Sequence, residues 1–395
     1  MKRVLFVDHV DRVQGGAELN IIELLTKSPF PREWRVACAC PDTSPLYNAL
    51  KNAGIECFDY RIPAALSEAR FVDRGFPLKR LMKWPAALRE ARWQLHTIIG
   101  QFKPDVLITC TNKDHFVAGN ACKLVNLPHV WWANDAVTGD FFSWPTRKAF
   151  GWYARNAGRL VAVSDYCREA LTKLGIPPEK TVTIHNGIPQ LTIDPNRSGT
   201  LREFFNIPMS ELLVGTAGRF TPWKGQELFL ELARRWVEDN RPGHFMLIGR
   251  AFNEEQAFEE KLKQFVVKHK LDGRVHFASY QSNLPATMME LDAFLHTSTR
   301  PEPFGRVLLE AMLARVPVIA ANAGGVPEII SHGEHGLLAR PGDVQDYFNQ
   351  MALLAASEAE RQKLAAAGRE RVLKQFTVNR VSQQFGKLLN ELVTQ

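Results

Sequence analysis

Long apolar runs are missing from this chain. No stretch of its 395 residues approaches the roughly 18 consecutive apolar residues that a membrane-spanning helix needs. The start, MKRVLFVDHV, carries two basic residues and a short apolar run, but Asp8 interrupts that run before the apolar segment of a signal peptide could form. We therefore expect a protein that spans no membrane and stays in the cytoplasm.

Cysteine is scarce and irregularly spaced. All six cysteines lie in the first half of the chain, none has a partner at CxxC spacing, and few suitably spaced histidines accompany them. Zinc sites and redox motifs need such spacing, and disulfides belong to oxidising compartments. The sequence therefore predicts buried, reduced thiols. They are Cys38, Cys40, Cys57, Cys110, Cys122 and Cys167.

A dinucleotide-binding fingerprint is also missing. A nucleotide-dependent oxidoreductase needs a GxGxxG turn after its first strand and an acidic residue near the end of its second. The segment after the first apolar run reads VDHVDRVQGGAE, which lacks that turn. The sequence therefore disfavours an oxidoreductase.

The overall composition is that of a soluble globular protein with a basic balance. Hydrophobic residues make up 45% and charged residues 23% of the chain, and its 395 residues suggest two to three domains of roughly 150 residues each. Lys and Arg number 49 against 42 Asp and Glu, a net charge of +7. This balance indicates anionic partners without choosing among nucleotide, nucleic acid and lipid.

Short apolar runs alternate with helical patterns in two successive sets. The first run is RVLFVD, Arg3–Asp8, and a Gly-rich turn and a helical pattern follow it. Runs of this kind are typical of buried parallel strands, and their alternation with helices predicts an α/β fold with helices on both faces of each sheet. Further strands are predicted near Val36, Leu107, Val130, Val161 and Val182 in the first set, and near Val214, Leu247, Val275, Leu295 and Ile319 in the second.

A linker separates the two sets. Residues 187–199, GIPQLTIDPNRSG, are rich in Pro, Gly and Asn. We therefore expect an N-terminal Rossmann-like domain over residues 1–190 and a C-terminal one over residues 191–375. The remaining segment, about residues 376–395, has apolar residues at helical spacing and predicts a final helix.

The run RPEPFGRVLLEAM carries two glutamates that we expect at one ligand. Glu302 lies between two prolines, which keep it out of regular structure, and Glu310 is the only charge on the first turns of a helix predicted from about Val307. Gly305 between them leaves the backbone open at the helix start, where phosphates and hydroxyls commonly bind. The structural alternative to a shared ligand is that Glu310 only caps the helix and Glu302 only faces solvent from its loop.

Three glycine-containing turns accompany this run. In AGRFTPWKGQ, Gly218 leaves the backbone open beside Arg219 and Lys224, which suit a diphosphate, although an Arg and a Lys on a loop are usually only solvated. In QGGAE, Gly15 and Gly16 could bring backbone N–H groups to a phosphate, although a glycine pair is more often a tight turn. The turn in ANAGGVPEII lies between a predicted strand and a predicted helix, and a purely structural role is its alternative.

These motifs together resemble the retaining nucleotide-sugar glycosyltransferases of family 4, which have the GT-B fold. The matching segments are the Gly16 loop, GRFTPWKG, EPFGRVLLEAM, PVIAANAGGVPEII and HGLLARPGD, in this order. The N-terminal half matches only at GGAE, VSDYC and IHNGI. The resemblance implies two doubly wound domains that face each other across a cleft, with the acceptor bound by the first, the donor by the second, and the final helix crossing back onto the first.

The resemblance also implies donor-binding roles. It assigns Glu302 to the sugar hydroxyls and Glu310 to the nucleotide ribose, while the Gly16 loop would close over the diphosphate. The other donor-binding residues that it implies are Arg219 and Lys224 at the diphosphate, Gly218 beside them, and the backbone of Phe304, Gly305 and Arg306 at the sugar and phosphate. Arg219, Lys224 and Glu302 are thereby the expected catalytic residues.

One departure concerns the acceptor. The family often has a His followed by Asp after the strand that corresponds to HVWWA, whereas this chain has Asn134 and Asp135 there. We assign acceptor binding to these two residues, together with Gly15 and Glu18. His115 and His129 lie nearby but out of register.

The predicted reaction needs stabilisation of a leaving nucleoside diphosphate, a task suited to fixed cations and helix N-termini. No DxD triplet occurs in the chain, so the sequence requires no metal ion to bridge the diphosphate, and we expect neither a metal site nor a cofactor. The resemblance implies attack from the face that the diphosphate leaves, with Glu302 as a binder and not a nucleophile.

Two stretches rich in basic and aromatic residues bear on the kind of surface to which the protein binds. Residues 70–92 hold seven basic residues and two acidic ones, interleaved with Trp and Phe, and FFSWPTRKAFGWYAR follows at residues 141–155. Such stretches suit an anionic membrane surface, but also single-stranded nucleic acid or a solvated helix face whose aromatics are core.

We expect a lipid-linked saccharide or lipopolysaccharide-type acceptor at the inner face of the cytoplasmic membrane, and no nucleic acid. The alternatives are a soluble acceptor, a sugar-nucleotide hydrolase, and a basic nucleic-acid-binding protein. The last would leave Arg219, Lys224 and the two glutamates unexplained.

Overall fold

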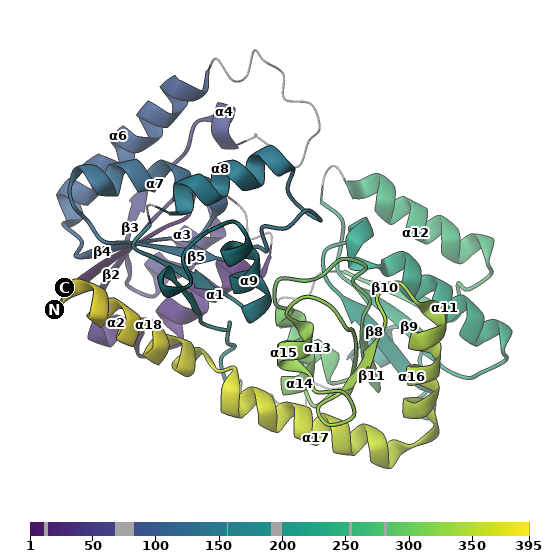
Figure 1. Cartoon of the computed structure of the whole chain (residues 1–395). Helices are drawn as coiled ribbons and strands as arrows, with labels where there is room; N and C mark the ends of the chain where they lie inside the picture. Colours follow the sequence, from purple (N-terminus) through teal and green to yellow (C-terminus); the bar gives the residue numbers. More distant parts are fainter. Residues whose placement is uncertain are drawn as a thin grey trace. The chain divides into compact units, whose positions relative to one another are not determined.

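The computed structural model describes residues 1–11, 15–67, 83–155, 157–190, 200–252, 255–279 and 283–394. The chain divides into unit 1, Met1–Pro189 with Thr377–Gln395, and unit 2, Gln190–Phe376 (Figure 1). This division differs by one residue from the boundaries expected after residues 190 and 375. Each unit is built on one parallel sheet, so the predicted α/β class is confirmed.

Unit 1 contains a seven-stranded sheet in the order β3-β2-β1-β4-β5-β6-β7. Its strands are β1 (Arg3–Val7), β2 (Arg35–Cys40), β3 (Glu56–Asp59), β4 (Val106–Thr109), β5 (His129–Ala133), β6 (Arg159–Ala162) and β7 (Thr181–Thr183). The strand order reverses between β1 and β4, and ligands of doubly wound sheets bind at the carboxyl ends of the strands at such a switch point. The residues that follow these two strands are therefore site candidates.

Two groups of helices pack in unit 1. Helices α4 (Ala64–Ser67), α6 (Trp84–Phe102), α7 (Asn112–Leu124) and α8 (Trp144–Ala154) contact one another in sequence, and α1 (Gly16–Thr26) contacts α2 (Phe30–Glu33), α3 (Pro45–Asn52) and α18 (Val378–Val393) (Figure 1). Helix α9 (Asp165–Lys173) and the short η1 (Pro178–Lys180) precede β7. Helix α6 buries Ala87, Ala91, Leu95, Ile98 and Phe102 at helical spacing, against the core formed with β1, β2 and β4.

The final helix, α18, belongs to unit 1, as the resemblance implied. Thr377 caps it by accepting a hydrogen bond from the backbone of Arg380, and the Val378 N–H donates to the carbonyl of Ile188 over 3.1 Å. Inside unit 1 the ring of Phe385 packs edge-on against Trp132, with ring centroids 4.9 Å apart. The aromatic contact and the apolar face of α18 together fix this segment.

Unit 2 repeats the design with a six-stranded parallel sheet in the order β10-β9-β8-β11-β12-β13. Its strands are β8 (Leu213–Ala217), β9 (His244–Ile248), β10 (Val275–Ala278), β11 (Ala293–His296), β12 (Val318–Ala321) and β13 (Leu337–Ala339). Its helices are α10 (Thr200–Phe204), η3 (Pro222–Lys224), α11 (Gln226–Glu238), α12 (Gln256–Lys268), α13 (Leu284–Met288), α14 (Arg306–Leu313), α15 (Val326–Ile329), α16 (Val344–Ala356) and α17 (Glu358–Gln375). The order reverses between β8 and β11, which sets the second switch point.

Eleven of these strands follow the predicted runs, whereas β3 and β13 were not predicted. Both lie at the edge of a sheet and are short, and β3 is only partly buried, so neither needs a long apolar run. All six cysteines are free, as predicted, and only Cys57 is not fully buried. Within the described ranges, no helix combines the length and apolar character required to cross a membrane.

Candidate active site

Glu302 lies at the centre of a bonded network in unit 2, in the loop between β11 and α14. Its carboxylate accepts hydrogen bonds from His296 Nε2 over 2.7 Å and from Ser298 Oγ over 2.8 Å, and it forms an ion pair with Lys224. The residue is only 9% exposed. These contacts exclude the alternative of a solvent-facing loop acid.

The network keeps Glu302 ionised. Burial alone would raise the pKa of Glu302, but the charge of Lys224, the charge of His296 and their hydrogen bonds outweigh burial and hold this pKa well below its ordinary value. An ionised carboxylate is a hydrogen-bond acceptor only. Glu302 is therefore suited to binding hydroxyl groups and not to donating a proton.

The glycine turn of ANAGGVPEII holds the backbone of Glu302. Glu302 and Gly324 form a parallel β-bridge, and the Gly325 N–H donates to the Glu302 carbonyl over 2.9 Å. Gly324 has a φ of +66°, and a Cβ atom there would lie 2.1 Å from the Glu302 carbonyl oxygen. The close approach therefore requires glycine, which gives this turn a direct role in positioning Glu302.

Helix α14 begins beside Glu302 and carries Glu310. Gly305 precedes it with a φ of +105°, which the sharp entry into the helix requires. The predicted start near Val307 is one residue late, because Arg306 is already helical. Arg306 Nε donates to Glu310 Oε1 over 3.0 Å, and both side chains are largely buried. The loop glutamate and the helix glutamate thus flank one helix start, where N–H groups favour anions.

The two predicted diphosphate cations lie after β8 and are both engaged by carboxylates. Arg219 Nε lies 3.7 Å from Glu255 Oε2, while Lys224 pairs with Glu302 and stands 4.3 Å from the centroid of the Trp223 ring. Gln226 donates to the Arg219 carbonyl over 2.9 Å. The structure therefore joins Lys224 to Glu302 directly, whereas the Arg219 backbone is linked to α11. Gly218 precedes Arg219 with a φ of +147°.

The predicted acceptor residues of unit 1 lie at the start of α1 and directly after β5. Gly15 precedes α1, which starts at Gly16, and the Gly15 N–H donates to the buried Glu18 carboxylate over 3.1 Å. Asn134 and Asp135 follow β5. The side chain of Asn134 donates to the Cys110 and Trp132 carbonyls.

Asp135 is linked to the start of α7. Its Oδ2 accepts a hydrogen bond from Asn112 Nδ2 over 2.8 Å. Asp135 is solvent-exposed and lies beside the switch point of unit 1.

A histidine–aspartate pair that the sequence did not indicate lies at the same switch point. His9 follows β1, and its Nδ1 stands 2.9 Å from Oδ2 of Asp114, which lies in the first turn of α7. The same carboxylate oxygen accepts from the His9 backbone over 3.0 Å and from Thr111 Oγ1 over 2.7 Å. Such a carboxylate fixes the proton on Nδ1 and leaves Nε2 as a hydrogen-bond acceptor.

The charge state of Asp114 supports this pairing. Burial raises the pKa of Asp114, but the charge of His9 and the hydrogen bonds from His9 and Thr111 outweigh it, so the pKa lies below its ordinary value. The pair is separated by 105 positions in sequence. The only available signal was that each residue closely follows a predicted strand.

His115 and His129 are core residues. Thr109 Oγ1 contacts His115 Nδ1 over 2.6 Å and His129 Nε2 over 2.9 Å, and His115 stacks on Trp131 with centroids 4.6 Å apart. Burial lowers the pKa of both imidazoles, that of His129 to about 3. Both are therefore neutral structural groups.

Two protein-family models match the chain. "Glycosyltransferase Family 4" matches residues 30–190, and "Glycosyl transferases group 1" matches residues 198–371. The chain belongs to glycosyltransferase family 4. The N-terminal match covers most of unit 1, where the sequence motifs alone resembled the family only loosely.

Relatives of this glycosyltransferase act in glycan synthesis. The lipopolysaccharide core biosynthesis mannosyltransferase LpsB of Rhizobium meliloti (strain 1021) is 29% identical over 259 residues, 64% of this chain and 72% of that protein. The lipopolysaccharide core biosynthesis glycosyltransferase LpsE of the same organism is 27% identical over 252 residues, 64% of this chain and 68% of that protein.

Solved structures identify the fold. The crystal structure of Anabaena Alr3699/HepE in complex with UDP-glucose matches this glycosyltransferase with a TM-score of 0.84 at 25% identity, over 99% of this chain and 100% of that one. The two parallel-sheet units thus form the GT-B fold that the motifs implied.

The basic, aromatic stretches of the glycosyltransferase expose tryptophan. Residues 70–82 of the first stretch lie outside the described residues, and the remainder falls in α6. Trp93, one position after it, is 69% exposed. The second stretch forms α8, where Trp144 and Trp152 are 64% and 62% exposed, whereas Phe150 is buried. The interpretation that these aromatics are simply core therefore holds for Phe150 and not for the three tryptophans.

Proposed function

We propose that this glycosyltransferase transfers a sugar, with retention of configuration, from a nucleotide-diphosphate sugar to a saccharide acceptor. The observation that carries the proposal is the ionised, buried Glu302, held by Lys224, His296 and Ser298 beside the start of α14. The complex of Anabaena Alr3699/HepE with UDP-glucose supports a donor of this class.

The donor roles divide along unit 2. Glu302 accepts hydrogen bonds from sugar hydroxyls, and Glu310 accepts them from the ribose. Arg219 and Lys224 bind the diphosphate, with Gly218 leaving room for it. The backbone of Phe304, Gly305 and Arg306 faces the sugar and phosphate.

Departure of the nucleoside diphosphate is stabilised by fixed charges. Lys224 and Arg219 already stand near carboxylates, so an incoming diphosphate shares or replaces Glu302 and Glu255 as their partners. The positive end of α14 adds to this field. We propose that these groups replace a bridging metal ion and that the reaction needs no cofactor.

Retention is assigned to attack on the face from which the diphosphate leaves. A carboxylate nucleophile would have to leave its hydrogen bonds, and three donors hold Glu302. Its contacts therefore favour a binding role over a nucleophilic one.

The acceptor site is assigned to the switch point of unit 1. His9 Nε2 accepts the proton of the acceptor hydroxyl or orients that hydroxyl, with Asp114 positioning the imidazole. Asn134, Asp135, Gly15 and Glu18 complete the proposed acceptor site. A histidine from β1 would in this way supply the function that Asn134 cannot.

The acceptor class follows from the relatives and the surface of unit 1. LpsB and LpsE act in lipopolysaccharide core biosynthesis. Exposed tryptophans on α6 and α8 suit a membrane interface. We therefore assign a lipid-linked or lipopolysaccharide-type saccharide, met by the enzyme at the inner face of the cytoplasmic membrane, and we assign no nucleic-acid partner.

The test is sugar transfer by Glu302→Ala and Glu302→Gln with the matched donor. Loss of the carboxylate is expected to lower kcat/KM by at least about 100-fold, because it removes a contact to the reacting sugar and leaves Lys224 unpaired. Glu302→Gln keeps the size and shape of the side chain and removes only its charge. A loss of activity in this variant therefore reports the missing charge and not a folding defect. Glu334→Gln, an exposed loop residue, is the control. Turnover near wild type in both Glu302 variants would refute the assignment.

A further inference from the structure

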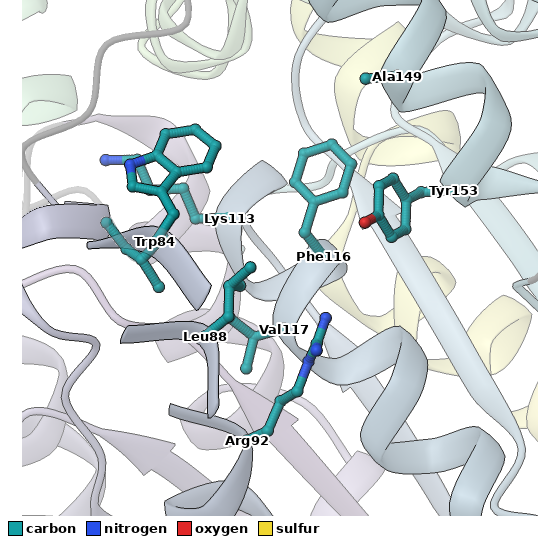
Figure 2. A pocket seen from close by; sticks show the side chains of 9 residues that line it. Trp84, Leu88, Arg92, Lys113, Phe116, Val117, Ala149 and Tyr153 are labelled. Atoms are coloured by element: carbon teal, nitrogen blue, oxygen red, sulfur yellow. The ribbon is translucent and has the colours of Figure 1, made fainter. Parts of the chain in front are cut away.

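A pocket of about 140 Å³ lies within unit 1 between helices α4, α6, α7 and α8 (Figure 2). Its wall is largely apolar and includes Leu88 from α6, Val117 and Phe116 from α7, and Tyr153 from α8. Phe116 and Tyr153 pack edge-on with centroids 5.0 Å apart. The pocket belongs to this layer of helices, and the His9–Asp114 pair does not line it.

The size and lining select an apolar ligand segment. Dry apolar cavities of about 150 Å³ are known to hold a molecule as large as benzene. A sugar in such a pocket would lose the hydrogen bonds that its hydroxyls make with water. The pocket therefore fits a short hydrocarbon segment, such as one isoprene unit or a few CH₂ groups, and not a saccharide.

Two cations line this apolar wall. Lys113 donates to the Ser67 carbonyl, and burial lowers its pKa. Arg92 Nε is buried, and no group in the described part of the chain hydrogen-bonds it. Figure 2 shows both side chains around Leu88 and Val117. Partly buried cations beside an apolar wall favour an anionic partner, so the ligand combines a hydrocarbon segment with a negative group.

The first turn of α7 connects this pocket to the proposed acceptor site. The side chains of three consecutive residues have different partners there. Asn112 donates a hydrogen bond to Asp135, Lys113 lines the pocket, and Asp114 is hydrogen-bonded to His9. A phosphate at Lys113 would therefore lie within one helical turn of the group that positions His9. A sugar attached to that phosphate can reach the switch point while its lipid chain enters the pocket.

The surface around the pocket has the character of a membrane interface. Trp93 extends from α6, and Trp144 and Trp152 extend from α8, all largely exposed. Lys148 stands 5.8 Å from the centroid of the Trp144 ring. Exposed tryptophan and lysine suit the headgroup region of an anionic bilayer, where a lipid-linked acceptor resides.

We propose that the pocket binds the lipid chain of a phosphate-linked acceptor, with the phosphate at Lys113 and the first hydrocarbon unit between Leu88, Val117 and Phe116. This inference rests on the proposed function, in which the acceptor is lipid-linked. Arg92 adds positive potential at the wall. Membrane phospholipid also combines a hydrocarbon chain with a phosphate. The test therefore distinguishes the acceptor lipid from membrane phospholipid.

The test is calorimetric titration of the full chain with farnesyl phosphate, farnesol and inorganic phosphate. Farnesyl phosphate is expected to bind at least about tenfold more tightly than either part alone, because the pocket and Lys113 act together. Ala149→Trp, which places a ring at the pocket, is expected to lower that affinity about tenfold, and Lys113→Met is expected to weaken farnesyl phosphate but not farnesol.

Matched controls isolate the pocket. Ala366→Trp adds the same ring at an exposed site on α17, and Lys123→Met removes an exposed cation from α7 itself; both are expected to bind like wild type. Wild-type affinity in Ala149→Trp and Lys113→Met would overturn the proposal. Binding to phosphatidylcholine–phosphatidylglycerol vesicles that Ala149→Trp abolishes, without binding of farnesyl phosphate, would overturn it in favour of membrane phospholipid.

A parallel measurement separates this proposal from the function on which it rests. Nucleotide-sugar binding by unit 2 is monitored by thermal shift in the same variants, and Ala149→Trp and Lys113→Met are expected to retain the wild-type shift. If both variants keep the wild-type thermal shift and also bind farnesyl phosphate like wild type, the pocket proposal is refuted and the proposed function stands. Absence of any nucleotide-sugar shift in wild type would refute the proposed function instead.

Discussion

The two units share one architecture but place their polar groups differently. In unit 2, residues at the end of β11 and in the segments after β8 and β11 meet at the switch point in one bonded network. The network joins Glu302 to Lys224, His296 and Ser298. In unit 1, the residues that follow β1 and β4 form the pair of His9 and Asp114. A compact charged network suits one highly charged ligand, whereas a histidine pair with separate amide and carboxyl groups suits a neutral saccharide.

The largest expected effect tests how rigidly unit 2 holds its network. Gly324→Ala places a Cβ atom 2.1 Å from the Glu302 carbonyl oxygen and forces this residue to move. Donor turnover is expected to fall about 100-fold, since a misplacement of about 1 Å can cost that much. Gly333→Ala is the control, because Gly333 has a similar φ of +76° and nothing within 4 Å of the added atom. Equal turnover in the two variants would show that the close approach does not position Glu302.

The next effect tests the corresponding pair in unit 1. His9→Gln is expected to lower the transfer rate about 100-fold while nucleotide-sugar affinity stays at the wild-type value, since a positioned acid–base group contributes about 10²-fold or more. His96→Gln, an exposed histidine on α6, is the control. A loss of donor affinity with unchanged transfer at saturating donor would contradict the division between the units.

Asp114→Asn sharpens the same test. The amide oxygen can still accept from His9 Nδ1, but the amide can also turn its NH₂ group toward the ring, so the orientation of the imidazole is no longer fixed. The transfer rate at saturating donor is therefore expected to fall without a change in thermal stability of the kind that a structural role would cause. An unchanged transfer rate together with reduced stability would show that Asp114 serves folding alone.

A smaller effect concerns two strand histidines, the buried His129 of unit 1 and the partly buried His276 of unit 2, and their contribution to the pH dependence of stability. Burial lowers the pKa of His129 in unit 1 to about 3 and that of His276 in unit 2 to about 4. The unfolded chain takes up protons first as pH falls below about 6.5, so folded-state stability falls between that pH and the folded pKa. His129→Gln is expected to reduce the loss between pH 6.5 and 5 by about 2 kcal/mol in urea unfolding. A pH dependence identical to wild type would contradict the buried, neutral state of His129.

The smallest effect concerns the surface tryptophans of unit 1. Trp144→Ser with Trp152→Ser is expected to weaken binding to anionic vesicles about fivefold, since the rings lose an interface contact, and to leave nucleotide-sugar affinity unchanged. Val267→Ser with Leu353→Ser removes two exposed apolar side chains from unit 2 and serves as the control. Equal vesicle binding by the two double variants would remove the support that the tryptophans give to a membrane-borne acceptor.

The sequence predicted the sheets well because buried parallel strands are continuous apolar runs. The edge strands β3 and β13 were missed because a partly solvated or three-residue strand has no such run. Glu302 and Glu310 were predicted as a pair because they are only eight positions apart and lie on either side of one predicted helix start. His296 and Ser298 were not assigned, since a histidine in an apolar strand does not indicate where its ring points.

The site features that the sequence did not predict depend on contacts between residues far apart in the chain. His9 and Asp114 meet only because β1 and β4 are neighbours across the switch point, and a linear pattern does not show that neighbourhood. The glycine turn at Gly324 was recognised as a motif, but its contact with Glu302 depends on the close approach of two loops. The pocket between α6, α7 and α8 likewise depends on how three helices pack, which periodicity alone does not determine.

The most direct test of the central claim is calorimetric titration of a matched donor pair, the free nucleoside diphosphate and its sugar derivative. The derivative is the one that gives the largest thermal shift among UDP, GDP and ADP sugars. Glu302→Gln is expected to bind the nucleoside diphosphate at least as tightly as wild type, because Lys224 is no longer paired with a carboxylate, and to lose the extra affinity for the sugar. Glu310→Gln is expected to weaken both ligands by about the same factor. Equal losses of both ligands in Glu302→Gln, or unchanged binding of both in Glu310→Gln, would contradict the division of unit 2 into a sugar-binding and a ribose-binding carboxylate.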